Sequence, residues 1–126
     1  MAIISFAWTT DAFKSGRKTC TRRNWNKEYA AKFVPGSVHE GYDRNPRFHG
    51  KPVGRLQIVR TPYIEATKDI PNEDFEYEGF AYMEERGILI QGITPREFFN
   101  RWRESDEVLF VVRFKLITPV PAKGAL

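Results

Sequence analysis

The chain has 126 residues, of which 41% are hydrophobic and 29% are charged, and its net charge at pH 7 is +4. This composition is that of an ordinary globular protein, and the length corresponds to one domain with its own hydrophobic core. No apolar run approaches the roughly 18 residues of a membrane-spanning helix, and the apolar residues 1–8 lack the flanks of a signal peptide. The single cysteine, Cys20, excludes an internal disulfide, so we expect a cytoplasmic protein that is not bound to a membrane.

The charge is distributed unevenly along the chain. Residues 1–60 contain 12 Lys and Arg against 4 Asp and Glu, whereas residues 61–126 contain 8 against 12. A basic surface in the first half would attract a polyanion such as RNA, particularly because its cations alternate with aromatic residues and turns. The alternative is that the two halves mix in space and their charges cancel.

The first half of the chain is expected to be mainly extended. β-branched and aromatic residues favour strands, and Gly, Pro, Asn and Asp mark the turns between them. In chain order we predict a strand over residues 2–8, a short helical turn over 12–14, an extended segment over 18–23, a loop or short helix over 24–35, a strand over 37–42, a loop over 43–52 and a long strand over 53–64.

The second half is expected to hold the main helices. One helix is predicted over residues 71–80, where Gly79 interrupts the helical pattern. Thr94, Pro95 and Glu97 form the N-terminal signature of a second helix of about three turns, in which Thr94 is the cap and Glu97 closes a capping box.

A final strand is predicted over residues 108–116, where Arg113 and Lys115 alternate with apolar residues. Residues 119–126 would form a tail, which leaves a single domain over residues 1–118. Strands followed by helices and a last strand indicate an α+β fold, in which a small curled sheet or partly open barrel is flanked by short helices.

The segment from Ser15 to Arg23 is the richest in functional groups. Its cations alternate with hydroxyl residues, and the segment contains Arg17, Lys18, Thr19, Thr21, Arg22 and Arg23. In an extended chain Lys18, Cys20 and Arg22 share one face, and Thr21 and Arg23 share the other. Ammonium, guanidinium and hydroxyl groups suit a phosphate or a base that carries a carbonyl group. The alternative is a solvated edge strand whose charges prevent sheet pairing.

Three motifs of this chain resemble those of the ASCH family. They are Gly16, Lys18, Thr21 and Arg22, then Glu78-Gly79-Phe80, then the aromatic pair Phe98 and Trp102 before the last strand. Their order agrees with the family from Ile4 to about Ile117. The resemblance implies a small PUA-like mixed β-barrel with a cleft lined by the first motif, and RNA or a nucleoside-like molecule as ligand. It also implies that Glu78 faces the cleft near Lys18, whereas composition alone would place this acid on a solvated helix face.

One branch of the ASCH family is similar to small amidohydrolases that remove the acetyl group from N4-acetylcytidine. For this chain the resemblance implies Lys18 as the base, Thr21 as the nucleophile and Glu78 as the proton shuttle. The chain departs from that compact branch by an added loop over residues 24–47 and by an extra connection over residues 88–94.

The added loop brings aromatic residues next to cations, as recognition of single-stranded RNA requires. The expected nucleic-acid contacts are Arg17, Lys18, Arg22, Arg23, Trp25, Tyr42, Arg44 and Arg47. Trp25 could instead close one end of the barrel. Other ASCH members resemble ribonucleases, and in that case Tyr42 or a histidine could move protons. His39 and His49 lack companions at metal-ligand spacing, so neither a metal nor a cofactor is expected.

Overall fold

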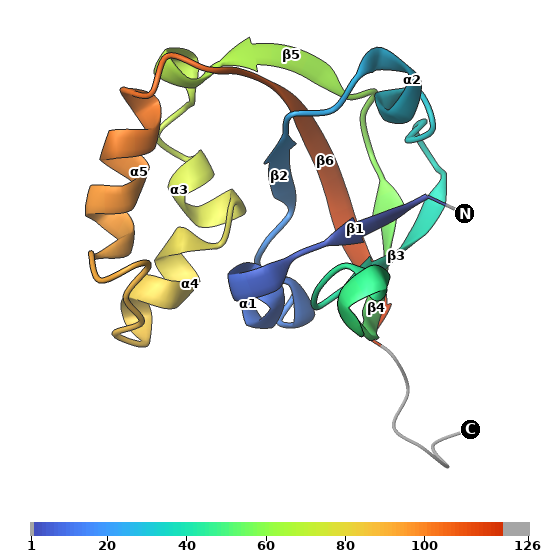
Figure 1. Ribbon diagram of the computed structural model, residues 1–126, viewed down its shortest axis with the longest axis horizontal. Coiled ribbons are helices and arrows are strands. Elements are labelled where there is room, and N and C mark those ends of the chain that lie inside the picture. Colours follow the sequence, from blue (N-terminus) through green and yellow to red (C-terminus); the bar gives the residue numbers. More distant parts are fainter. Residues whose placement is uncertain (1, 120–126) are drawn as a thin grey trace.

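Residues 2–119, which the computed structural model describes, form a curved six-stranded sheet and five short α-helices, the last three of which are grouped beside the sheet (Figure 1). The strands are β1 (Ile3–Ser5), β2 (Cys20–Arg23), β3 (Val38–Tyr42), β4 (Pro52–Ile58), β5 (Tyr63–Ala66) and β6 (Val108–Pro119). The α-helices are α1 (Thr10–Lys14), α2 (Lys27–Ala30), α3 (Asp74–Tyr77), α4 (Phe80–Glu85) and α5 (Pro95–Arg103). The 3₁₀ turns are η1 (Ala7–Thr9), η2 (Pro46–Phe48) and η3 (Thr67–Asp69). None of these helices has the length and apolar character needed to cross a membrane.

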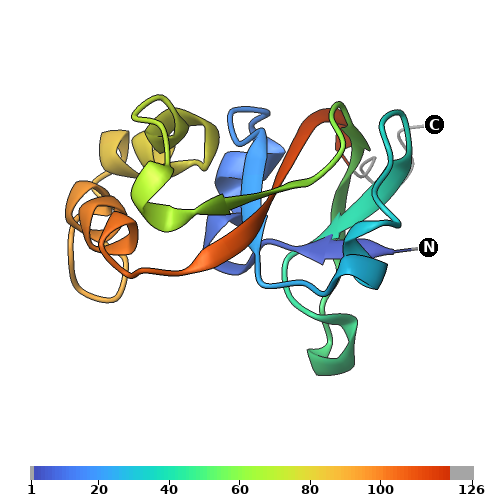
Figure 2. The ribbon, with the colours of Figure 1, turned by 90° about the horizontal axis from the view of Figure 1, so that it is seen from above.

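The long strand β6 pairs with β2, β4 and β5, and Figure 2 shows it, in orange to red, running from the helices on the left to the strands on the right. One of its edges carries β4 and then β5, both antiparallel, with Ile58 opposite Phe114 and Ala66 opposite Val108. The other edge carries β2, with Cys20 opposite Arg113. The strand order is β1-β3-β4-β6-β2, and β1 is parallel to β3. The α+β prediction is therefore confirmed.

The predicted strand over residues 53–64 is in fact two strands, β4 and β5, that follow one another along β6. The chain leaves the ladder between them, over residues 59–62. The register changes across this break, because Ile58 lies opposite Phe114 and Tyr63 lies opposite Val111. Proline at position 62 has no N–H to donate to a ladder, which favours the interruption there.

The predicted strand over residues 2–8 is wrong in its length, since β1 ends at Ser5. The backbone N–H and the hydroxyl of Thr9 both donate to the carbonyl of Phe6, at 2.9 and 2.7 Å, and this bends the chain into η1. At the other end of the domain, β6 extends to Pro119, so the predicted tail begins later than expected. Residues 120–126 lie outside the described part of the chain.

The single helix predicted over residues 71–80 is wrong, because the segment forms two short helices, α3 and α4. Gly79 separates them with a φ of +100°, a conformation that favours glycine. Thr94 caps α5 as predicted, and its hydroxyl accepts the backbone N–H of Glu97 at 3.1 Å. The side chain of Glu97 pairs with Arg101 instead of closing the capping box.

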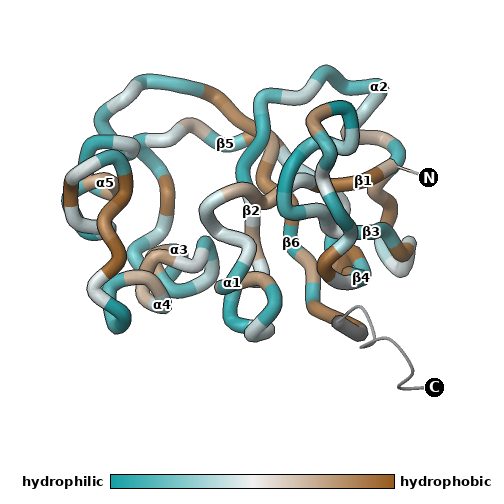
Figure 3. Tube along the Cα trace, turned by 60° about the horizontal axis from the view of Figure 1, so that its bottom comes forward, coloured by the Kyte–Doolittle hydropathy of each residue, from teal (hydrophilic) through white to brown (hydrophobic). Residues whose placement is uncertain are grey.

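Two separate hydrophobic cores lie on either side of β2, and Figure 3 shows hydrophobic stretches in the sheet and in the helices. The concave side of the sheet buries Ile4, Phe6, Phe13, Phe33, Leu56, Ile58, Val112 and Phe114. The helical side buries Ile70, Phe75, Phe80, Met83, Ile90 and Phe99. Val111 and Val112 of β6 are both fully buried. Since neighbouring residues of a strand face opposite sides, β6 is buried on both of its faces.

The sheet does not close on itself, because its strand pairing does not join β1 to β2. A side chain crosses this seam instead. Arg23 of β2 donates from Nη2 to the carbonyl of Ser5 in β1, at 2.6 Å. The two edge strands are therefore linked by one guanidinium group and leave a gap between their main chains.

Candidate functional site

Strand β2 carries the cationic motif into the space between the two cores. The chain enters β2 through Gly16, whose φ is +84°, and two backbone bonds then hold it in place. The N–H of Lys18 donates to the carbonyl of Ala12 at 3.1 Å, and that of Thr19 to the carbonyl of Tyr77 at 2.8 Å. These bonds fix the start of β2 between α1 and α3, so its side chains point into the protein and not into solvent.

The buried pair of Lys18 and Glu78 lies at the centre of the site. Lys18 is 2% exposed and Glu78 is 4% exposed. The Lys18 amino group donates to the backbone carbonyl of Glu78 at 2.7 Å and to its Oε1 at 3.1 Å. Burial lowers the pKa of Lys18, and the charge of Glu78 opposes that shift. The expectation of a solvated helix face for Glu78 is wrong, and its expected position beside Lys18 is confirmed.

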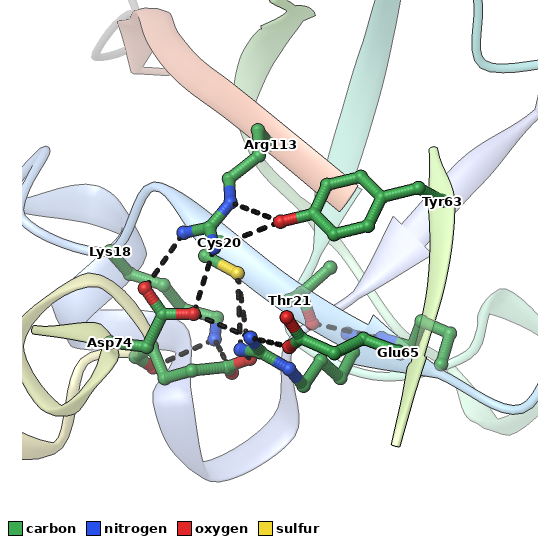
Figure 4. Close-up of polar contacts among 10 residues, drawn as sticks. Lys18, Cys20, Thr21, Tyr63, Glu65, Asp74 and Arg113 are labelled. Atoms are coloured by element: carbon green, nitrogen blue, oxygen red, sulfur yellow. Dashed lines mark hydrogen bonds and ion pairs between the residues drawn. The ribbon is translucent and has the colours of Figure 1, made fainter. Parts of the chain in front are cut away.

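Arg22 extends this pair into a larger ionic cluster, part of which Figure 4 shows. Its Nη1 donates to Oε2 of Glu78 at 2.8 Å, and its Nη2 donates to Glu65 at 2.7 Å and to Asp74. Its Nε is the one buried side-chain nitrogen or oxygen without a partner in residues 2–119. Lys18 and Arg22 thus share one face of β2, as the alternation predicts.

Asp74 joins the cluster to the central strand. Arg113 of β6 donates to both carboxylate oxygens of Asp74, each at 2.9 Å, and also contacts the hydroxyl of Tyr63. Burial acts to raise the pKa of Asp74, but the hydrogen bonds from Arg113 and Arg22 hold it below its usual value. The carboxylates at this place are therefore all engaged by cations of the chain.

Cys20 lies inside the same cluster and is fully buried, with its Sγ at 3.6 Å from Oε2 of Glu78. Burial, followed by the charge of Glu78, raises the pKa of the Cys20 thiol, so it stays protonated. No group of three His, Cys, Asp or Glu residues that could hold a metal ion occurs in residues 2–119.

Thr21 faces the other side of β2 together with Arg23. The Nε of Arg23 donates to Oγ1 of Thr21 at 3.0 Å. Lys18 and Glu78 are bonded to each other, but among the described residues neither is hydrogen bonded to Thr21. The three residues with implied catalytic roles therefore lie in one region without forming a connected chain of hydrogen bonds.

Thr21 borders a pocket of about 310 Å³ that opens beside β2. Its lining includes both aromatic and polar side chains. The lining residues are Trp8, Thr9, Thr21, Arg22, Arg23, Glu78, Phe80, Phe98 and Trp102. The ring of Trp8 lies 6.0 Å from that of Phe80 and 5.5 Å from that of Phe98, and Trp102 meets Phe80 edge to face. The pocket thus combines aromatic side chains with Arg22 and Glu78, two residues of the buried ionic cluster.

Other hollows on the surface are larger but lack this chemistry. One of about 510 Å³ lies beside β1 and is lined by Trp25, Tyr29 and Asn45 among others. Another, of about 330 Å³, is lined mainly by apolar residues near Ala30 and Phe110. Neither contains a residue of the Lys18, Glu78 and Asp74 cluster, so we take the pocket beside β2 as the candidate site.

Six of the predicted nucleic-acid contacts do not line this pocket, and one of them is Lys18, which is buried against Glu78. Arg17 pairs with Glu76 and Glu85 on the surface, with N–O distances of 2.7 and 2.6 Å. Trp25 stacks on Phe33 at 4.5 Å and packs against the sheet core, as the alternative interpretation expects. The remaining three lie at the end of β3 and in the loop after it; they are Tyr42, Arg44 and Arg47. Their role as RNA contacts stays a prediction.

The histidines also lie away from the pocket lining. His39 is buried in β3, where its ring nitrogens contact the Ser37 hydroxyl and the Ala2 carbonyl. His49 is exposed and ends η2 in a left-handed conformation, with a φ of +66°. Neither is placed to move protons at the pocket.

Several residues of the site carry no signal in the sequence that identifies them. Trp8 belongs to an apolar run typical of a strand, and Asp74 is one acid among many in its segment. Arg113 alternates with apolar residues as a solvated strand residue would. The first ASCH motif has the pattern G-x-K-x-x-T-x-R, and counted from Gly16 its arginine falls on Arg23 and not on Arg22. The structure gives this arginine the bond to Thr21.

Comparison with known proteins supports the fold alone. No protein-family model matches the chain, and no curated protein matches it. Among solved structures, protein EF3133 from Enterococcus faecalis V583, described by the family designation DUF984, is similar with a TM-score of 0.59. The match covers 94% of this chain and 77% of that protein, with 14% sequence identity. The two chains therefore share a fold, and the likeness says nothing about activity.

Proposed function

We propose that this chain is an ASCH-type domain whose pocket beside β2 binds one nucleobase, either in a free or modified nucleoside or as an unstacked base of single-stranded RNA. The observation that carries the proposal is the presence of aromatic and polar side chains in the lining of one pocket. Trp8, Phe98 and Trp102 are among the aromatic lining residues, and Thr21 and Glu78 are among the polar ones. Proteins that bind unpaired bases stack them on aromatic rings and read their edges with polar groups.

The size of the pocket suits one base better than a strand of RNA. Small-molecule sites have volumes of roughly 300–1,000 Å³, and this pocket, at about 310 Å³, is at the small end of that range. An extended RNA site also needs a row of free cations. Arg17 is neutralised by Glu76 and Glu85, and the cluster around Arg22 is neutralised by buried carboxylates.

The assignment to the ASCH type is supported by where its three motifs meet. Lys18 and Glu78, from the first two motifs, form the buried pair, and the aromatic pair Phe98 and Trp102 lines the adjoining pocket. The link from Arg23 to Ser5 brings the two edge strands together as a PUA-like barrel would require. Residues of three motifs that are far apart in the sequence thus meet in or beside one pocket, as a shared ligand would require.

The test is direct binding. Cytidine, N4-acetylcytidine and a short single-stranded RNA would be titrated into the protein, with tryptophan fluorescence and calorimetry as readouts. Trp8→Ala should weaken binding about tenfold or more, since base stacking contributes roughly 1–3 kcal/mol. The control Phe48→Ala removes an exposed aromatic outside the pocket and should leave affinity unchanged.

Salt distinguishes the two forms of the ligand. Affinity for an uncharged nucleoside should hardly change with salt, whereas affinity for RNA held by its phosphates falls steeply. Absence of binding to all three ligands at low salt would refute the proposal.

A second candidate function is hydrolysis of an amide on the nucleoside, and Lys18 favours it. A lysine must have a lowered pKa to act as a base near neutral pH, and burial lowers that of Lys18 beside Glu78. Thr21 would then have to exchange its bond with Arg23 for one with Lys18. Incubation with N4-acetylcytidine and detection of cytidine tests this candidate, and activity that survives Lys18→Ala would exclude the mechanism.

A further inference from the structure

We infer that the base pairs with the free main-chain edge of β2 at Arg22, whose backbone N–H and C=O bind an adjacent acceptor and donor on the base. The inference rests on the proposed function and adds how the ligand is read. It assigns recognition to the main chain, whereas both the sequence motifs and the ionic cluster draw attention to side chains.

The first observation is which residues of the antiparallel pair β2 and β6 direct their main-chain N–H and C=O groups toward one another. The N–H of Phe114 donates to the carbonyl of Thr19 at 2.9 Å, so Phe114 turns its main-chain groups toward β2. The N–H of Val59 donates to the carbonyl of Arg113 at 3.1 Å, so Arg113 turns its groups toward the opposite edge. Main-chain direction alternates along a strand, and Val112 and Phe110 therefore also face β2.

This alternation along β6 determines which residues of β2 are hydrogen bonded to it. Thr21 lies opposite Val112 and Arg23 lies opposite Phe110, so both are in hydrogen-bonded pairs. Arg22 lies opposite Val111, and its N–H and C=O are directed away from β6. Since β2 is an edge strand and β1 does not pair with it, no described residue bonds these two groups.

The second observation is which part of Arg22 is exposed. The whole residue is 7% exposed, whereas its side chain is only 1% exposed. Its accessible surface is therefore mainly main chain. Arg22 is also one of the residues that line the pocket. The pocket is thus bordered by an unpaired peptide N–H and C=O, whereas most such groups in folded proteins have a partner.

The chemistry of this edge defines the class of ligand. A main-chain N–H and C=O on the same side of a strand bind a partner that has an acceptor next to a donor, as a second strand does. A flat ring between aromatic walls meets this need when a ring nitrogen or carbonyl lies beside an N–H. Cytosine and adenine have this pattern, and so do uracil and guanine with the two roles placed on other atoms. Sugars and simple phosphates have no flat edge of this kind.

Amide hydrogen exchange measured by NMR tests the free protein and the complex. In the free protein the N–H of Arg22 should exchange much faster than those of Thr21 and Arg23, its bonded neighbours. Saturating cytidine should slow the exchange of Arg22 at least tenfold and leave its two neighbours unchanged. An Arg22 amide that is already protected without ligand would overturn the inference.

Ligands with one group removed give an independent test. 3-Deazacytidine lacks the ring acceptor and N4,N4-dimethylcytidine lacks the donor, and each should bind about tenfold more weakly than cytidine, as expected for the loss of one hydrogen bond. If cytidine binds and Trp8→Ala weakens it, but both analogues bind as cytidine does, the proposed function stands and the main-chain inference fails. If no nucleoside binds, both fail.

Discussion

Glu78 holds the amino group of Lys18 with two of its own oxygens, the backbone carbonyl at 2.7 Å and Oε1 at 3.1 Å. A single residue thus provides both the charge and the dipole that a buried ammonium group needs. The second carboxylate oxygen of Glu78 accepts from Arg22 at 2.8 Å. The carboxylate is therefore fixed in direction by two cations, Arg22 in β2 and Lys18 just before it, and it meets the pocket in one orientation.

The buried pair of Lys18 and Glu78 should make the free energy of unfolding depend on pH in the alkaline range. Because burial lowers the pKa of Lys18, the unfolded chain holds this proton more tightly than the native protein does. The contribution of Lys18 to the free energy of unfolding should therefore rise with pH between its lowered pKa and about 10.4, the ordinary value. Urea denaturation at pH 7 and pH 10 should show the stability of the wild type rising relative to Lys18→Met. Lys14→Met, at an exposed position, controls for the loss of a positive charge.

Asp74 should be the most important acid for stability. Asp74→Asn leaves the guanidinium groups of Arg22 and Arg113 without their shared carboxylate, and we expect a loss of about 3 kcal/mol at pH 7. Glu73→Gln, one residue earlier and exposed, should change the free energy of unfolding by less than about 0.5 kcal/mol.

The same carboxylate should contribute to acid unfolding. The pKa of Asp74 is lowered in the native state, so its stabilisation is complete above about pH 4 and is lost as pH falls through the native value. Chemical denaturation between pH 2 and pH 7 should therefore show a weaker pH dependence for Asp74→Asn than for the wild type. Equal slopes in the two proteins would contradict the assignment.

Gly79 should tolerate no side chain. Its φ is +100°, and a Cβ there would lie 2.9 Å from Cβ of Ala12, where the helix α1 approaches. Gly36 has a similar φ of +88° with nothing within 4 Å, so Gly36→Ala measures the conformational effect alone. We expect a loss of about 1 kcal/mol for Gly36→Ala and about 3 kcal/mol for Gly79→Ala. Similar losses in thermal unfolding would show that close approach is not limiting.

Arg23 should hold the open seam of the sheet together. Arg23→Met removes the bonds to Ser5 and Thr21, and we expect a loss of about 2 kcal/mol with faster hydrogen exchange in β1. Arg55→Met is the control, because its pairing with Glu40 is long, at 3.8 Å, and exposed. Unchanged exchange in β1 for Arg23→Met would mean that the pairing of β1 with β3 is sufficient.

Short-range patterns in the sequence predict much of this fold. The alternation along β2 places Lys18 and Arg22 on one face, and Thr94 marks the start of α5 correctly. These features depend on residues within a few positions of each other, so local stereochemistry determines them. The resemblance to the ASCH family adds the position of Glu78, which no local pattern indicates.

The parts that could not be predicted depend on distant partners. The break over residues 59–62 follows from the register with β6, which lies some 50 residues further along the chain. Asp74 differs from its acidic neighbours only because Arg22 and Arg113 meet it. Trp8 belongs to the pocket because the chain turns at η1, and its apolar neighbours predicted a longer strand instead.

The pairing of β2 with β6 also determines when the pocket can exist during synthesis. Roughly 90 residues separate the two strands, and the carboxylates of the ionic cluster, Glu65, Asp74 and Glu78, lie between them in the sequence. Until the ribosome has released residues 108–119, Arg113 is missing and both edges of β2 are unprotected. A nascent chain stalled before that point would expose a cationic strand open at both edges, a target for chaperones that the finished protein no longer presents.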